Sequence, residues 1–207
     1  MGTDFLPLSV YHPCRSVAHF LSQDVAKPDA SQSDRMADYG SLIAGVRAVL
    51  AADPVLTDPA AGFLAKYGLT LNGVAQSPSR ANSIFGSDPP GDRNFPCLTL
   101  WETSFRPAVP RQNDHPMAGV ELDLQISAWG KRQDLRPIIT EIDNVIEGAW
   151  YAGAMDTAAW KFADIDTSGS WSVIRVPDSF AMDSGQPIVQ MAKAFTVNAS
   201  NKTLGLV

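Results

Sequence analysis

Cysteine and histidine are scarce in this chain of 207 residues, which has two cysteines and three histidines. Cys14 and Cys97 lie far apart, and neither has a second cysteine or a histidine at metal-ligand spacing, which excludes a CxxC redox motif and a zinc site. The histidines are scattered, without partners for a ligand set or a catalytic triad: His12, His19 and His115. We therefore predict buried free thiols and no metal site.

Long apolar runs and an excess of positive charge are also missing. No stretch reaches the roughly 18 consecutive apolar residues of a membrane-spanning helix. Asp4 and Pro7 stand where a signal peptide would carry basic and then apolar residues, so we expect neither membrane contact nor secretion. With 16 Lys and Arg against 22 Asp and Glu, the formal net charge is −6. We do not expect this chain to grip nucleic acid, because affinity for phosphates comes chiefly from Lys and Arg.

The sequence lacks the common motifs of cofactor binding and nucleophilic catalysis. It has no GxGxxG, GxxxxGK(S/T) or GxSxG pattern, and we predict no catalytic residue and no cofactor. The stretch from Asp164 to Gly169 resembles the opening of a calcium loop, but Arg175 stands where that loop needs a bidentate glutamate. A hairpin turn is the better interpretation of this stretch.

The clearest signals that are present lie in residues 120–150. Apolar and polar residues alternate over 120–129, the pattern of a strand with one buried and one wet face. Residues 135–149 then place apolar side chains at i, i+3, i+4 and i+7, which predicts an amphipathic helix. We expect Asp134 to cap this helix and Pro137 to lie in its first turn, where a missing N–H loses no partner.

Two further helices are predicted upstream. Residues 39–50 carry a helical apolar stripe that ends before Asp53 and Pro54, because a residue before proline disfavours the α conformation. Asp58 is expected to cap a second, short helix that Gly68 ends.

The remaining signals predict strands. We expect them at residues 96–105 and 188–198, a brief edge strand at 83–85, and a hairpin formed by 160–165 and 170–176. A proline-rich stretch, residues 106–119, is predicted to be a long loop between two antiparallel strands. The fold class is therefore α+β, with an antiparallel β-sheet and two main helices packed on one of its faces. One domain of residues 35–207 follows an N-terminal arm of residues 1–34.

Four residues are candidates for a protein interface. Trp129 falls on the polar face of its strand, which indicates either a partner across that face or a strand that ends or bulges there. Arg106 and Arg111, in the long loop, could offer their guanidinium donors to carboxylates of a partner, and Asp114 lies in the same loop. The alternative for these charges is that they are simply solvated.

The order of these elements resembles the tail terminator, or tail completion, proteins of long-tailed bacteriophages. The resemblance covers about residues 36–198 and includes the strings RNFPCLTL (residues 93–100) and ELDLQISAWGK (residues 121–131). The arm and the long segment at residues 70–94 depart from the family pattern. The resemblance implies a structural virion protein, not an enzyme, that forms a homo-hexameric ring, caps the tail tube and joins the tail to the head.

The same resemblance implies the partners and the location. These are the tail tube protein, the head–tail connector (stopper) protein, and a place in the tail or neck of the virion after assembly in the host cytoplasm. An acidic ring wall would let DNA pass without specific binding. Alternatives are another head–tail joining ring, such as a stopper or adaptor, or a tail tube subunit. A small enzyme that uses Glu121 and Asp123 as an acid pair is a more distant alternative.

Overall fold

The sheet is built around strand β5 (Gly119–Lys131), which contains the strand predicted at residues 120–129. One face of β5 is apolar and almost entirely buried, with Val120, Leu122, Leu124, Ile126 and Ala128. This computed structural model describes residues 40–86, 89, 91, 93–107, 119–174, 182–183 and 186–202. The predicted arm, residues 1–34, lies outside the described residues.

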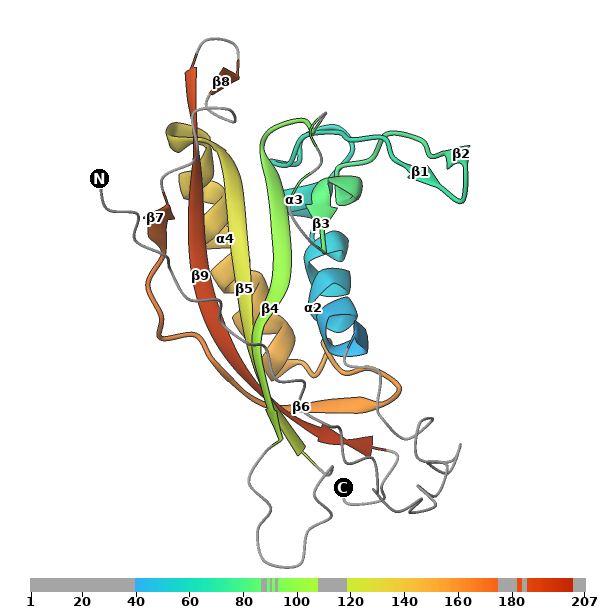
Figure 1. The fold of residues 1–207 in the computed structure, drawn as a ribbon, viewed down its shortest axis with the longest axis vertical. Coiled ribbons are helices and arrows are strands. Elements are labelled where there is room, and N and C mark those ends of the chain that lie inside the picture. The colour runs from blue at the N-terminus through green and yellow to red at the C-terminus, as the bar shows by residue number, and fades with distance from the viewer. Residues whose placement is uncertain are drawn as a thin grey trace, which may run out of the picture. The chain divides into compact units, whose positions relative to one another are not determined.

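The main sheet contains the described strands other than β1 and β2. Strands β3, β4, β5, β9 and β6 lie side by side in that order, and β7 and β8 also pair with β9 (Figure 1). Their bounds are β3 (Ile84–Phe85), β4 (Cys97–Pro107), β6 (Trp160–Asp166), β7 (Ser172–Ile174), β8 (Met182–Asp183) and β9 (Gln186–Asn201). Pairing is antiparallel except between β3 and β4. The strands predicted at residues 96–105 and 188–198 and the edge strand at 83–85 are confirmed.

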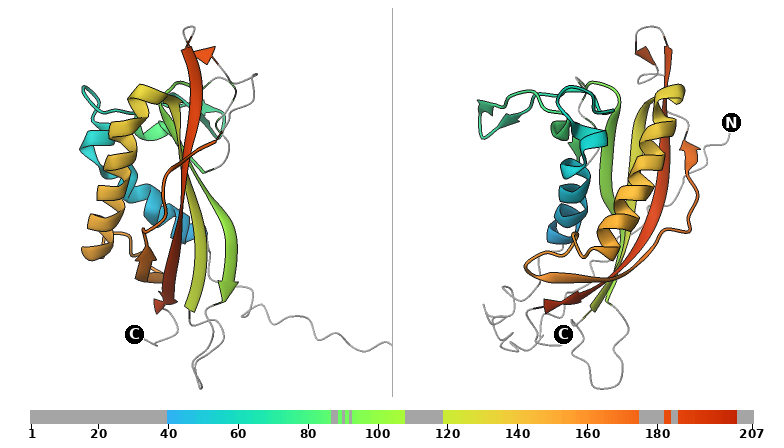
Figure 2. Two further views of the ribbon diagram at one scale, coloured as in Figure 1. Left: turned by 90° about the vertical axis from the view of Figure 1, so that its left-hand side faces the viewer. Right: turned by 180° about the vertical axis from the view of Figure 1, so that it is seen from behind.

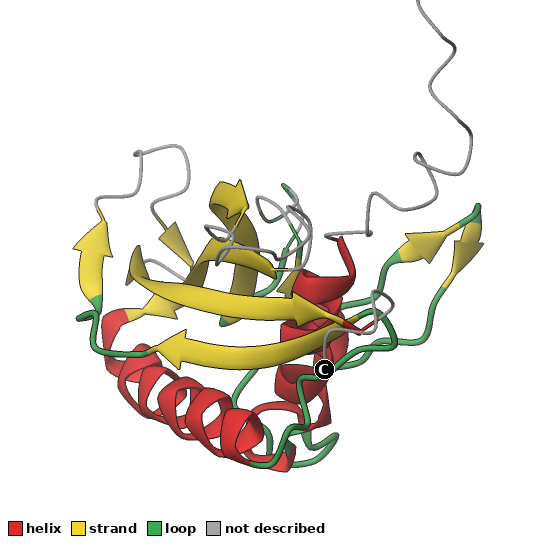
Figure 3. Ribbon diagram, turned by 90° about the horizontal axis from the view of Figure 1, so that it is seen from below, coloured by secondary structure: helices red, strands yellow, loops and turns green. Residues whose placement is uncertain are grey.

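Two main helices, α2 (Gly40–Ala52) and α4 (Arg132–Tyr151), pack on the apolar face of this sheet. Figures 2 and 3 show both helices on the same side of the strands. Their stripes supply much of the core, with Leu42, Val46 and Leu50 from α2 and Leu135, Ile138, Ile142 and Ile146 from α4. The predicted α+β fold is thereby confirmed. Within the described ranges, no helix is long and apolar enough to cross a membrane.

The predicted start of α4 is wrong. Asp134 lies in the first turn instead of capping the helix, and Pro137 lies in the helix interior. The N-cap is Lys131, the last residue of β5, so the strand passes directly into the helix. Gly130 permits this tight corner, because a Cβ atom there would stand 3.1 Å from the Leu135 side chain.

The short helix predicted to begin after Asp58 is also wrong. The structure has α3 (Pro54–Thr57), one turn earlier, because Asp53 carries the same aspartate–proline signal. The Asp53 carboxylate accepts the backbone N–H of Leu56 at 2.8 Å and so caps α3. Asp58 instead closes a turn, where two backbone N–H groups hold the pKa of its carboxyl below the usual value.

The predicted hairpin between residues 160–165 and 170–176 does not form. Strands β6 and β7 both run antiparallel to β9 and follow one another along the same edge of it. Gly169, between them, lies so close to β9 that a Cβ atom would stand 3.0 Å from the Ala194 carbonyl oxygen. Pairing with β9 places Phe162 and Ile165 of β6 in the core.

Candidate interaction surface on the open face of the sheet

The face of the sheet opposite α2 and α4, which we call the open face, carries mainly polar side chains. Among the described elements, both main helices lie on the other side (Figure 3). Strand register aligns the open-face residues of β4, β5 and β9 in rows, one of which joins Ser104, Asp123 and Thr196. A second row joins Arg106, Glu121 and Asn198.

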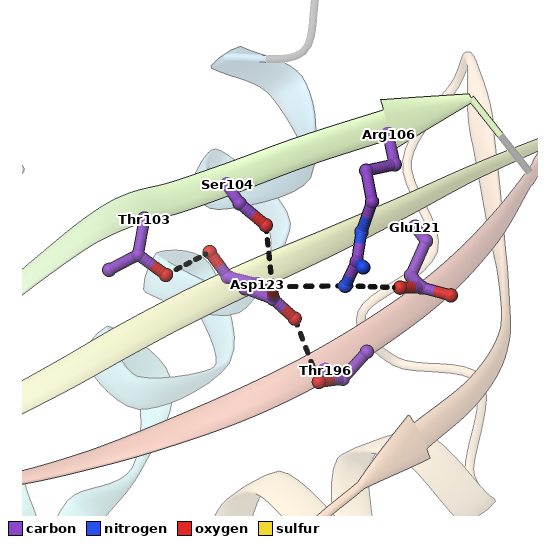
Figure 4. A network of polar contacts seen from close by, with 6 residues as sticks. All are labelled: Thr103, Ser104, Arg106, Glu121, Asp123 and Thr196. Atoms are coloured by element: carbon purple, nitrogen blue, oxygen red, sulfur yellow. Dashed lines mark hydrogen bonds and ion pairs between the residues drawn. The ribbon is translucent and has the colours of Figure 1, made fainter.

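Asp123 is the centre of a network that ties these three strands together (Figure 4). One carboxylate oxygen accepts the Ser104 hydroxyl at 2.5 Å, and the other accepts the Thr196 hydroxyl at 2.8 Å. The Arg106 guanidinium lies 3.3 Å from Asp123 and 2.6 Å from a carboxylate oxygen of Glu121. Hydrogen bonds from Ser104 and Thr196 hold the pKa of the Asp123 carboxyl below its usual value of 3.8.

This geometry does not suit Glu121 and Asp123 to acid–base catalysis. A general acid at neutral pH needs a raised pKa, whereas the donors around Asp123 stabilise its ionised form. Arg106 lies between the two carboxylates and offers its charge to both. The network therefore holds β4, β5 and β9 together, and we call its residues Ser104, Arg106, Glu121, Asp123 and Thr196 the Asp123 clasp.

We predict that Asp123→Asn lowers the free energy of unfolding by about 1–2 kcal/mol at pH 7, because donors from two strands lose a charged acceptor. Since the folded-state pKa is lowered, this stabilisation is fully present above about pH 3.8 and is lost as the pH falls through the folded pKa. Urea unfolding of both proteins from pH 7 downward measures the difference. A difference that stays constant below pH 3.8 would contradict this origin. Glu102→Gln, at an exposed carboxylate of β4, is the control.

Trp129 lies near the other end of the open face, in a small apolar cluster with Cys97, Phe85 and Phe95. Its side chain is only 7% exposed, and its indole N–H donates to the Thr99 hydroxyl at 3.0 Å. The strand neither ends nor bulges at Trp129, since Trp129 pairs with Cys97 of β4 and the pairing with β9 runs on to Lys131. The exposure that first indicated a partner for Trp129 is therefore absent.

Burial in this cluster raises the pKa of the Cys97 thiol to about 12. Cys97 is a free, buried cysteine, as predicted. Cys14 lies outside the described residues.

The other predicted interface residues divide into two groups. Arg106 does not lie in the long loop, as predicted, but in strand β4, and it remains 60% exposed despite its ion pair with Glu121. Arg111 and Asp114 lie outside the described residues, so the interface role of the loop stays a prediction. In the described part of the chain, no group of three His, Cys, Asp or Glu could hold a metal ion.

Three surface features were missed by sequence reasoning. The first is a projecting hairpin, β1 (Thr70–Leu71) and β2 (Val74–Ala75), whose signal was the Asn72-Gly73 pair between apolar residues. The second is a groove between α2 and α4. The third is a hollow of about 780 Å³ at the start of α4, lined by Lys131, Arg132, Gln133, Arg136, Pro187 and Val189. The last two had no sequence signal, because each joins residues distant in the chain.

No protein-family model matches the chain, and no curated protein matches it.

Proposed function

We propose that this chain is a structural subunit of a ring at the end of a bacteriophage tail, a tail terminator that caps the tail tube and joins it to the head connector. The observation that carries the proposal is the asymmetry of the sheet. One face is sealed by two helices, whereas the open face is polar and bears the Asp123 clasp. Thr99, Ser127 and Gln190 of this face are buried, but around the clasp the side chains of Arg106, Glu121 and Asp123 are 60%, 35% and 24% exposed. This exposed part of the sheet can form part of a channel wall.

The charge on the open face supports passage of DNA without specific binding. Around the clasp, register places four carboxylates against two cations: Glu121, Asp123, Asp164 and Asp166 against Arg106 and Lys161. Arg106, moreover, is paired with Glu121 at 2.6 Å, so its charge is already compensated. Phosphate groups would meet a surface with more negative than positive charge, to which they do not adhere.

The edge of β4 supports assembly with neighbouring copies. Among the described residues, β3 pairs only with Leu98 and Thr99 of β4, although β4 runs on to Pro107. Within the described residues, the part of that edge from Leu100 to Ser104 offers backbone donors and acceptors, which another chain can pair with. Contacts between different surfaces of identical copies produce closed rings when the rotation closes, and we propose six copies here.

The test is the copy number and position of the chain in an assembled particle. We expect one ring of six copies at the head-proximal end of the tail, measured by the mass of the tail-bound assembly and by low-resolution imaging of particles that carry a labelled chain. Twelve copies would indicate an adaptor, and copies repeated along the tail would indicate a tube subunit. A chain absent from particles would overturn the proposal.

A further inference from the structure

The β1–β2 hairpin is a preformed projection. Asn72 and Gly73 both have positive φ, 51° and 77°, as a two-residue type I′ turn requires. Below the turn, Gln76 N–H donates to the Leu69 carbonyl at 2.7 Å, and Tyr67 and Ser79 exchange two backbone hydrogen bonds. Figure 1 shows the hairpin extending away from the sheet and from α2.

The tip of this hairpin is apolar. Leu71 and Val74 are directly paired, so their side chains lie on the same face, and they are 58% and 62% exposed. An isolated two-stranded hairpin is marginally stable in water. A paired leucine and valine at such a tip therefore gain most from burial against another surface.

A matching hollow lies on the helical side of the same chain. The groove between α2 and α4 has a volume of about 450 Å³ and is lined by Val49, Ala52, Asp53, Pro54, Glu141, Asn144, Val145, Gly148, Ala149 and Ala154. Its lining is mostly small and apolar. At Gly148 a Cβ atom would meet nothing within 4 Å, so the groove is open at that point.

We propose that the Leu71–Val74 tip of one copy docks into the α2–α4 groove of a neighbouring copy. Charge favours this pairing, because residues 59–85 contain Lys66 and Arg80 and no carboxylate. The described groove lining contains Asp53 and Glu141 and no cation. The contact joins two different surfaces and is thus the type from which rings are built. This contact rests on the proposed function in one respect only, the assumption that six copies form the ring in which it occurs.

Site-directed cross-linking tests the contact directly. One preparation carries Val74→Cys and a second carries Gly148→Cys, both with Cys14→Ser, while Cys97 is protected by burial. The two are mixed and treated with a short bifunctional maleimide. We expect a cross-linked dimer that contains one chain of each kind. Glu147→Cys, one residue along α4, exposed and outside the groove lining, is the matched control and should cross-link far less. Equal yields from both would overturn the proposal.

Blocking each surface tests its energetic role. Leu71→Asp and Gly148→Leu should each weaken self-association by roughly tenfold or more, measured by sedimentation over a concentration series. Thr70→Asp, on the opposite face of the hairpin, and Glu147→Leu should leave self-association unchanged. Thermal melting of all four variants checks that they fold, which we expect because the positions are exposed.

The outcomes separate this inference from the proposed function. Six-membered rings that form normally with Leu71→Asp and Gly148→Leu would overturn the docking contact and leave the terminator proposal intact. Loss of tail attachment by Leu71→Asp with rings retained would assign the tip to a different protein and also overturn the contact. A hairpin–groove cross-link in a chain that particles lack would support the contact and overturn the terminator proposal.

Discussion

Replacing Ile142 with aspartate is expected to abolish folding. Ile142 is fully buried in the middle of the α4 stripe, within the hydrophobic core cluster. An unpaired carboxylate there costs several kcal/mol, against a total stability of about 5–15 kcal/mol for a typical domain. Far-UV circular dichroism and urea unfolding of the purified variant measure the outcome.

The matched control is Thr140→Asp, two residues away on the exposed side of the same helix. It introduces the same side chain and should change the free energy of unfolding by no more than about 0.5 kcal/mol. An Ile142→Asp protein that is soluble and melts like the parent would show that α4 does not pack on the sheet as described.

The second large effect is expected at Asp143, where Asp143→Ala should cost roughly 3 kcal/mol. One carboxylate oxygen of Asp143 lies 2.8 Å from the ammonium group of Lys193, and the other accepts the Trp171 indole N–H at 3.0 Å. The Lys193 side chain is only 5% exposed, although Asp143 itself is 36% exposed. Removing the carboxylate leaves a nearly buried ammonium without its partner.

The double variant Asp143→Ala with Lys193→Met separates this cause from lost packing. Methionine keeps the aliphatic length of Lys193 and removes its charge, so the double variant should regain much of the stability. Urea unfolding of the single and double variants completes the cycle. A double variant less stable than Asp143→Ala would show that the buried charge is not the main cost.

Lys193 is a residue whose environment the alternation of apolar and polar residues along β9 does not predict. It occupies a position of β9 opposite Ile126, on the helical face of the sheet, where the pattern calls for an apolar residue. Only the packing of α4 over β9 brings Asp143 to it. In the sequence pattern, Asp143 is one of several polar residues on the polar side of the helix, and nothing there indicates a buried partner.

The open-face clasp was half predictable. Alternation in β5 places Glu121 and Asp123 on one face, as the sequence indicated. Simple alternation in β4 would place Arg106 on the same side as Leu98 and Leu100, away from both acids. The register shift between Glu102 and Ser104 reverses this, so Ser104 and Arg106 face the open side.

The sequence by itself determined the elements whose signal is local. Strand β5, the apolar stripes of α2 and α4 and the presence of strands β4 and β9 follow from periods of 2 and 3.6, which arise from the geometry of the backbone. The tertiary structure decided which segments pair. Strands β6 and β7 could pair with each other or with β9, and the longer ladder with β9 prevailed because it also buries Phe162 and Ile165 in the core. Such competition depends on surfaces distant in the chain, which local patterns do not contain.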